Sequence, residues 1–197
     1  SEGNNIPDGW TLDTVISQAH GRYGLFGWMN DTIMRGVHTQ AAQASTTDLG
    51  GIYLPHSNNM RLIGCRADQS VYGFITDSNP GGSPDTPGSS ITMVGCGTEN
   101  NLKNALLMTN SSTTWQQSRT PVLATGCSWD FPGQDGASAA VRVEGWNLLT
   151  MWNCNITNGG GPGPIAGIEF HSIGSLPGVP AAVYIDGGTY SNVAGNG

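Results

Sequence analysis

The segment Ile91-Thr92-Met93-Val94-Gly95-Cys96 decides the fold, because related segments recur along the whole chain. In each, a short apolar stretch leads into glycine or asparagine and then a cysteine. Such copies occupy 60–65, 91–96, 122–127 and 149–154, with cysteine spacings of 31, 31 and 27 residues. Copies without cysteine occupy 32–37 and 183–188, and a weaker one occupies 10–15. Self-similarity at this period is typical of a solenoid.

A second set of short apolar strands lies between these copies. Each begins with glycine or alanine, as a tight corner requires. They occupy 24–26, 51–54, 73–76, 105–108, 140–143 and 167–170. The two-residue period of a strand then predicts which side chains point inward. One inward row is Met34, Leu62, Met93, Ala124, Met151 and Ile185, with the cysteine row beside it. The facing row is Ile52, Phe74, Leu106, Val141 and Ile168.

The pattern predicts an all-β fold, a right-handed parallel β-helix of about six to seven coils. We expect residues 1–197 to form a single β-helix segment of a longer polypeptide. A two-layer sandwich would also use alternating strands, but it does not explain seven registers at one repeat length.

The four cysteines allow three interpretations. Coils about 4.8 Å apart would let neighbouring cysteines form a disulfide if their side-chain directions allowed it. A zinc finger is excluded because no CxxC pair occurs,. A line of identical small residues is most typical of free, buried thiols, with a disulfide or another metal site as alternatives.

Composition narrows the classes of function. The formal net charge is −7, and the seven basic residues lie scattered, so the chain lacks the basic stripe that nucleic acid requires. The apolar stretches are too short to predict membrane insertion. No GxGxxG, P-loop, HExxH, EF-hand or calcium-binding GGxGxDx motif occurs, so we expect no cofactor and no metal.

The repeated glycine-cysteine step, with strands of the Gly51-Ile52-Tyr53-Leu54 kind, resembles the pectate-lyase-like β-helix superfamily, most of all bacteriophage tailspike or tail-fibre shafts. The resemblance implies a virion protein of the phage tail that binds, and in some members degrades, a bacterial surface polysaccharide. The alternatives are a secreted polysaccharide lyase or glycoside hydrolase of this superfamily and a non-catalytic structural shaft. Fold alone does not choose among them.

Outward-facing apolar residues add an expectation about assembly. Tyr53, Ile75 and Leu107 should point away from the core on adjacent coils. Exposed apolar rows are unfavourable for a monomer, so we expect sister chains to pack together as a homotrimer.

The candidate catalytic residues are Arg142, Glu144, Glu169 and His171, which the same alternation gathers on two neighbouring coils. Diagonal neighbours in a sheet have backbone separations of about 7 to 8 Å, compatible with an inverting glycosidase that uses Glu144 and Glu169 as acid and base. A lyase would instead pair Arg142 with His171. Glycan contact without chemistry and a plain surface ion pair remain alternatives.

Other polar and aromatic residues are weaker candidates. Four acidic residues are expected in turns or corners, namely Asp85, Glu99, Asp130 and Asp135. The candidates for stacking on sugars are Trp28, Trp115, Trp129, Trp146 and Trp152, of which Trp115 is favoured and Trp129 should point inward. Long return connections fall at 79–89, 110–120 and 174–180, a side of a solenoid that often binds ligands.

Overall fold

The computed structural model describes nine parts of the chain. These are residues 9–19, 21–41, 50–55, 57–77, 90–109, 120–144, 147–158, 164–171 and 182–191. They form twenty β-strands. No helix among the described residues is long and apolar enough to cross a membrane.

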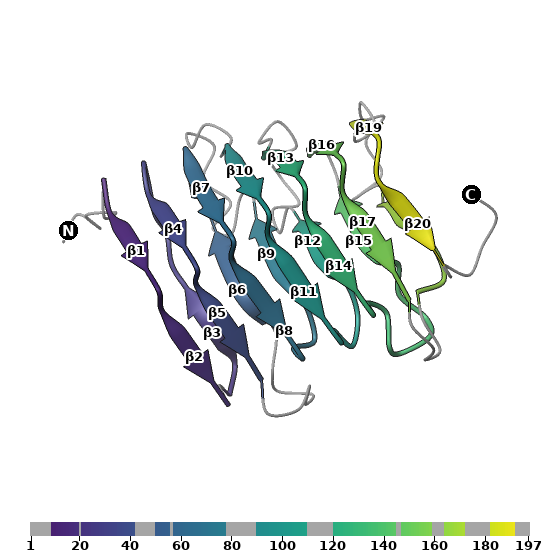
Figure 1. Cartoon of the computed structure of the whole chain (residues 1–197), viewed down its shortest axis with the longest axis horizontal. Helices are drawn as coiled ribbons and strands as arrows, with labels where there is room; N and C mark the ends of the chain where they lie inside the picture. Colours follow the sequence, from purple (N-terminus) through teal and green to yellow (C-terminus); the bar gives the residue numbers. More distant parts are fainter. Residues whose placement is uncertain are drawn as a thin grey trace.

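The strands form three parallel sheets that run the length of the molecule (Figure 1). The first sheet contains β1 (Thr11–Asp13), β4 (Ile33–Arg35), β7 (Met60–Ile63), β10 (Ile91–Val94), β13 (Pro121–Thr125), β16 (Leu148–Trp152) and β19 (Ala182–Asp186). The second contains β2 (Ile16–Gln18), β5 (His38–Gln40), β8 (Arg66–Asp68), β11 (Gly97–Glu99), β14 (Ser128–Asp130), β17 (Asn155–Thr157) and β20 (Thr189–Ser191). The third contains β3 (Tyr23–Phe26), β6 (Gly50–Pro55), β9 (Phe74–Asp77), β12 (Leu106–Thr109), β15 (Val141–Glu144) and β18 (Ile168–His171).

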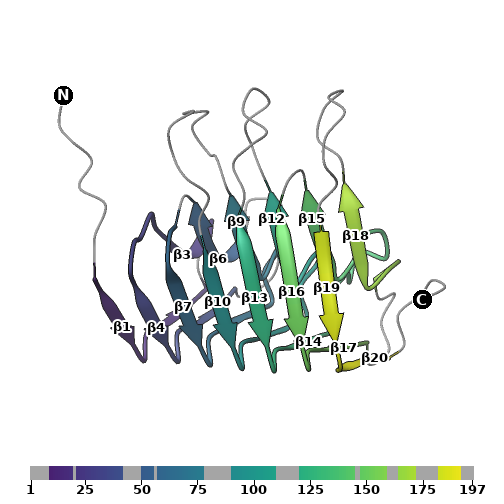
Figure 2. The same cartoon turned by 90° about the horizontal axis from the view of Figure 1, so that it is seen from above.

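Each coil contributes one strand to each sheet in turn, and every coil pairs in parallel with the next. Figure 2 shows the first sheet in front, with the third sheet behind it. The chain is therefore a right-handed parallel β-helix, as the repeat predicts.

The pairing register confirms both predicted inward rows. Met34 pairs with Leu62 and Leu62 with Met93 in the first sheet, and Phe74 pairs with Leu106 in the third. Most members of the two rows are buried in one continuous core. Ile185 is 48% exposed and Ile168 only half-buried, because β19 and β18 are the last strands of their sheets and have a neighbour on one side only.

A left-handed corner residue ends each strand of the first sheet. The φ angle is positive at Thr14, Gly36, Gly64, Gly95, Gly126, Asn153 and Gly187, between 50° and 68°. A Cβ added at Gly95 would meet no atom within 4 Å, so the backbone angle, and not lack of space, favours glycine there. The residue that follows the corner, such as Cys96, turns back into the core.

The four cysteines are free and buried, which agrees with the interpretation as packing residues. The thiol of Cys96 donates to the carbonyl oxygen of Leu62 at 3.4 Å, on the preceding coil. Hydrogen bonds with the Cys127 and Cys65 thiols, together with burial, raise the pKa of Cys96 well above its ordinary value of 9.0. The Cys96 thiol therefore stays protonated, and each of the four thiols donates a weak hydrogen bond to a backbone carbonyl on the preceding coil,.

The second sheet was not anticipated as a separate layer. Its strands are three residues long and turn only the middle residue inward, as in Thr39, Ala67, Thr98, Trp129 and Ile156. Trp129 points inward as predicted and is fully buried. The two flanking residues of each strand face outward and are mostly polar.

The corner geometry predicts different outcomes for two substitutions of Gly95. Gly95→Ala should lower the free energy of unfolding by about 1 kcal/mol, because a Cβ is disfavoured at positive φ. Gly95→Asn should be better tolerated, since Asn153 already occupies the equivalent corner,. Urea unfolding of both variants measures the difference. Equal stability of the two would contradict this account of the corner.

Candidate functional site

The predicted charged cluster lies on the outer face of the third sheet. The register pairs Arg142 with Glu169 and Glu144 with His171 on β15 and β18, neighbouring strands in Figure 2. The structure therefore brings the four residues together as the sequence predicts.

Arg142 lies between the two carboxylates. Its Nε donates to Glu144 Oε1 at 2.7 Å, and its Nη1 lies 3.6 Å from Glu169 Oε2. His171 Nδ1 is 4.0 Å from Glu169 Oε1. Glu169 thus stands between Arg142 and His171, the two residues that a lyase would pair, and contacts both.

Glu144 is held more firmly than Glu169. Thr109 Oγ1, on β12, donates to Glu144 Oε2 at 2.5 Å, so both carboxylate oxygens accept hydrogen bonds. The Asn147 amide also donates to the carbonyl oxygens of Glu144 and Thr109 and fixes the ends of both strands. The Glu144 side chain is 14% exposed and that of Glu169 is 35% exposed.

These contacts suit binding better than acid/base catalysis. A general acid needs a proton that it can give to the leaving group. Glu144 accepts at both oxygens, and the nearest partners of Glu169 are Arg142 and His171. The outer edge of the cluster, formed by Glu169 and His171, remains accessible to a ligand.

The cluster continues a longer row of outward-facing residues, which we call the outer row. In order along the sheet it consists of Phe26, Tyr53, Ile75, Leu107, Arg142 and Glu169. With neighbouring strands about 4.8 Å apart, the row is about 24 Å long. It runs along the helix axis, from β3 to β18.

The expected exposure of the apolar part of this row needs correction. Ile75 lies in the outer row, but it is only 6% exposed. The reason is Gly50: a Cβ at that position would be 2.6 Å from Ile75 Cδ1, so the missing side chain leaves room for Ile75. Tyr53 and Leu107 are half-buried. The row therefore does not form the exposed apolar surface on which the homotrimer expectation rested.

An aromatic hollow at the other end of the outer row was missed by the sequence analysis. It has a volume of about 570 Å³ and is lined by Arg22, Tyr23, Phe26 and Tyr53. The ring centroids lie 5.6 Å apart for Tyr23 and Phe26, 5.0 Å for Tyr23 and Tyr53, and 5.4 Å for Phe26 and Tyr53. The signal in the sequence is the position of Phe26 and Tyr53 in equivalent strands.

A hydrogen bond from its hydroxyl group holds the Tyr53 ring in place. Its hydroxyl donates to Asp77 Oδ2 at 3.2 Å, and Asp77 is buried. Burial, followed by the charge and hydrogen bond of Asp77, raises the pKa of Tyr53 well above its ordinary value of 10.0. The hydroxyl therefore remains a donor over the whole physiological range.

A second charged network lies on the outer face of the second sheet. Asp68 Oδ2 is 2.9 Å from His38 Nε2 and accepts from Arg66 Nε at 3.1 Å. Arg66 Nη2 also reaches Glu99 Oε2 at 3.5 Å. Every one of these groups already has a partner, and the alternation of opposite charges across coils is typical of a stabilised surface.

The other acidic candidates divide into strand and turn residues. Glu99 and Asp130 end strands β11 and β14, so placing them in turns was wrong. Ser128 and Thr157 hydroxyls donate to Asp130. Asp135 is a turn residue as predicted, since it accepts from the N–H groups of Ala137 and Ser138. Asp85 lies outside the described residues.

The candidate tryptophans that the structure describes do not come together in one site. Trp28 is exposed in the connection after β3, and Trp152 is exposed at the end of β16. Trp115 and Trp146 lie outside the described residues. So do most residues of the three long return connections. Among the residues that the structure describes, no group of three His, Cys, Asp or Glu side chains could hold a metal ion.

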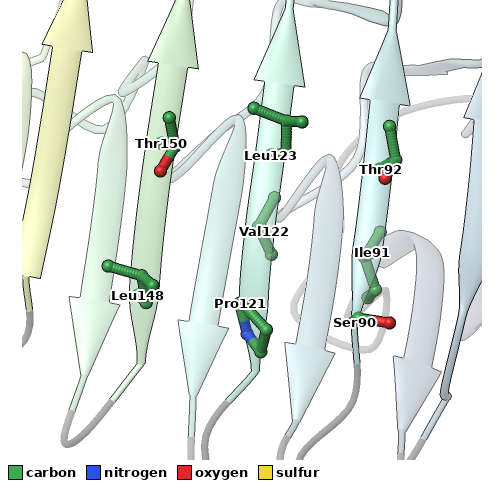
Figure 3. A pocket seen from close by; sticks show the side chains of 8 residues that line it. All are labelled: Ser90, Ile91, Thr92, Pro121, Val122, Leu123, Leu148 and Thr150. Atoms are coloured by element: carbon green, nitrogen blue, oxygen red, sulfur yellow. The ribbon is translucent and has the colours of Figure 1, made fainter.

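The outer face of the first sheet has only a shallow hollow of about 150 Å³ (Figure 3). Figure 3 shows Thr92, Leu123 and Thr150 on three neighbouring strands, with Pro121 and Leu148 beside them. No charged residue lines it, and it is smaller than the sites of about 300–1,000 Å³ that usually hold small ligands.

Comparison with known proteins assigns no relative: no family model, no curated protein and no solved structure matches this chain. Function has to be argued from the surfaces described above.

The Tyr53–Asp77 contact predicts how stability changes in alkali. Because the folded state holds the Tyr53 proton more tightly than the unfolded state, this contribution is complete below pH 10 and is lost as the pH rises above about 10,. Tyr53→Phe should lose less free energy of unfolding than the wild type does as the pH rises above about 10. Tyr184→Phe, which removes the hydroxyl of an exposed tyrosine, is the control and should behave as the wild type does. Urea unfolding between pH 8 and pH 11 measures the slopes. Identical slopes for wild type and Tyr53→Phe would refute the assignment.

Proposed function

We propose that this chain is a β-helix segment of a bacteriophage tailspike or tail fibre, and that the outer face of its third sheet binds a bacterial surface polysaccharide. The observation that supports the proposal is the outer row, with an aromatic hollow at one end and the charged cluster at the other. The resemblance of the repeat to tailspike shafts supports a location on the virion.

A linear polymer fits the outer row better than a small molecule does. The row is long and shallow, and a chain lying along the helix axis would meet a new coil about every 4.8 Å. Contacts from the exposed members of the row would each add a little affinity. A compact ligand would touch only one end of the row.

The chemistry of the two ends fits the two kinds of surface that a sugar offers. Hydroxyl and acidic groups of a glycan bind charged side chains through strong, charge-assisted hydrogen bonds. Glu169 and His171 are the exposed members of the charged cluster that can form them. Apolar C–H faces of sugar rings suit exposed aromatic rings, and Phe26 is 56% exposed,.

The first sheet supports the proposal that sister chains assemble, as in a homotrimer. Its outer face exposes Ile63, Val94, Trp152 and Tyr184. Ile63, Val94 and Trp152 lie in one outward row, with Thr125 between Val94 and Trp152, and Tyr184 lies in the next row. Exposed apolar side chains gathered on one face are typical of interfaces. Assembly through this face would leave the outer row of the third sheet open to a glycan.

Binding to purified capsular and O-antigen polysaccharides tests the proposal. Arg142→Ala should weaken binding of the recognised polysaccharide by about tenfold or more, because it also releases Glu144 and Glu169 from their shared partner. Arg61→Ala, on the first sheet, is the matched control and should bind as the wild type does. Calorimetric titration gives the affinities. If no polysaccharide binds, or if Arg142→Ala binds normally, the proposed surface is wrong.

Catalysis by the charged cluster is a separate question, tested on any polysaccharide that binds. Because Glu144 accepts hydrogen bonds at both oxygens and Glu169 lies beside Arg142, we expect no release of reducing ends or unsaturated sugars,. If the wild type does release such sugars, the variants Glu144→Gln and Glu169→Gln show whether these two residues catalyse the cleavage. Loss of turnover with folding intact would restore the hydrolase or lyase alternative, including the secreted enzyme.

A further inference from the structure

We propose that the aromatic hollow of Arg22, Tyr23, Phe26 and Tyr53 is a binding site for one acidic sugar residue, with the pyranose ring on Phe26 and its negative group on Arg22. This inference rests on the proposed function and adds the class of sugar that the surface selects. It concerns the end of the outer row opposite to the charged cluster.

The hollow has the size and the surface of a sugar site. Its volume of about 570 Å³ lies within the range of about 300–1,000 Å³ for small-ligand sites,. Tyr23 and Phe26 are stacked with 26° between their planes, so the two rings support each other while Phe26 remains exposed to a ligand. Tyr53 stands tilted against both rings, at 40° to Tyr23 and 57° to Phe26. An aromatic surface with a tilted wall accepts a flat apolar face from one side.

The rings are already in position before a ligand arrives. The hydroxyl of Tyr53 is bonded to buried Asp77, and the three rings contact one another. A rigid aromatic site loses little side-chain entropy on binding, so a larger part of the contact energy becomes affinity. Phe26 nevertheless remains 56% exposed, which leaves apolar area that a ligand can cover.

Arg22 sets the charge of the ligand. Its guanidinium carbon lies 5.6 Å from the Tyr23 ring centroid. Arg66 and Arg142 are paired with carboxylates, but no carboxylate among the described residues forms an ion pair with Arg22. In a chain of net charge −7, this exposed cation beside an apolar hollow favours a ligand that is apolar on one face and anionic at its edge. A sugar acid has both properties.

The test uses oligosaccharides of defined length containing glucuronate or galacturonate, with neutral glucose and galactose oligosaccharides of equal length. Calorimetry gives the affinities, and circular dichroism and thermal unfolding check that each variant folds. Phe26→Ala should weaken binding of the recognised acidic oligosaccharide by about fivefold or more. Arg22→Gln should abolish the preference for acidic over neutral sugars. Tyr184→Ala removes an exposed aromatic ring on the first sheet, outside the hollow, and should leave the affinities for these oligosaccharides unchanged.

The outcomes separate this site from the charged cluster. If Phe26→Ala binds more weakly and Arg22→Gln loses the preference for acidic sugars, the hollow is supported as the binding site. This conclusion does not depend on the affinity of Arg142→Ala. Weaker binding in Arg142→Ala alone leaves the proposed function standing and overturns the hollow. Equal affinity of the wild type for acidic and neutral sugars overturns the assigned sugar class. Self-association that disappears in Phe26→Ala would make the hollow a contact between copies of the chain and would also overturn it.

Discussion

The in-register stacking of one coil on the next is the constraint on which the whole structure depends. It holds because every coil turns at a left-handed corner before its cysteine position, as at Gly64, Gly95 and Gly126. The corner sends the following side chain, such as Cys96, back into the core, and strand pairing places Met93 on Leu62 and Ala124 on Met93. A corner shifted by one residue would turn the core residues of that coil toward solvent. Glycine and asparagine at the corner are therefore as important for the fold as the apolar rows.

The same constraint explains why the outer surfaces consist of rows. Once inward positions are fixed, the alternate positions face outward at equal intervals, and side chains of successive coils become neighbours. Arg142 and Glu169 are 27 residues apart in sequence and form a direct register pair. Contacts of this kind connect coils without a loop or a pocket. A β-helix surface of this type suits extended ligands, and its specificity depends on which side chain each coil presents.

The sequence predicts the coil and the two longer strand sets because these have strong, repeated signals. Met34, Leu62 and Met93 recur at equivalent positions of the repeat, and the cysteines mark the period. The second sheet gives no such signal, since a three-residue strand such as Ser128–Asp130 has one inward side chain and shows no alternation. The sequence around Glu99 and Asp130 therefore favours turns, although both residues end strands. The charged cluster was predictable from the register alone, but its hydrogen bonds to Thr109 were not, because they depend on side-chain geometry.

Exposure is the property that the register does not fix, and Ile75 shows why. Its place in the outer row follows from alternation, but its burial follows from the absence of a side chain at Gly50 on the neighbouring coil. Gly50 is also the register partner of Tyr23, so the position that makes room for Ile75 pairs with the strand that carries the aromatic hollow. The outer row thus changes from buried aliphatic at Ile75 to exposed aromatic at Phe26 within two coils. A glycine in an outward position of a β-helix therefore affects the surface as much as a charged residue does, because it decides which neighbouring side chains a ligand can reach.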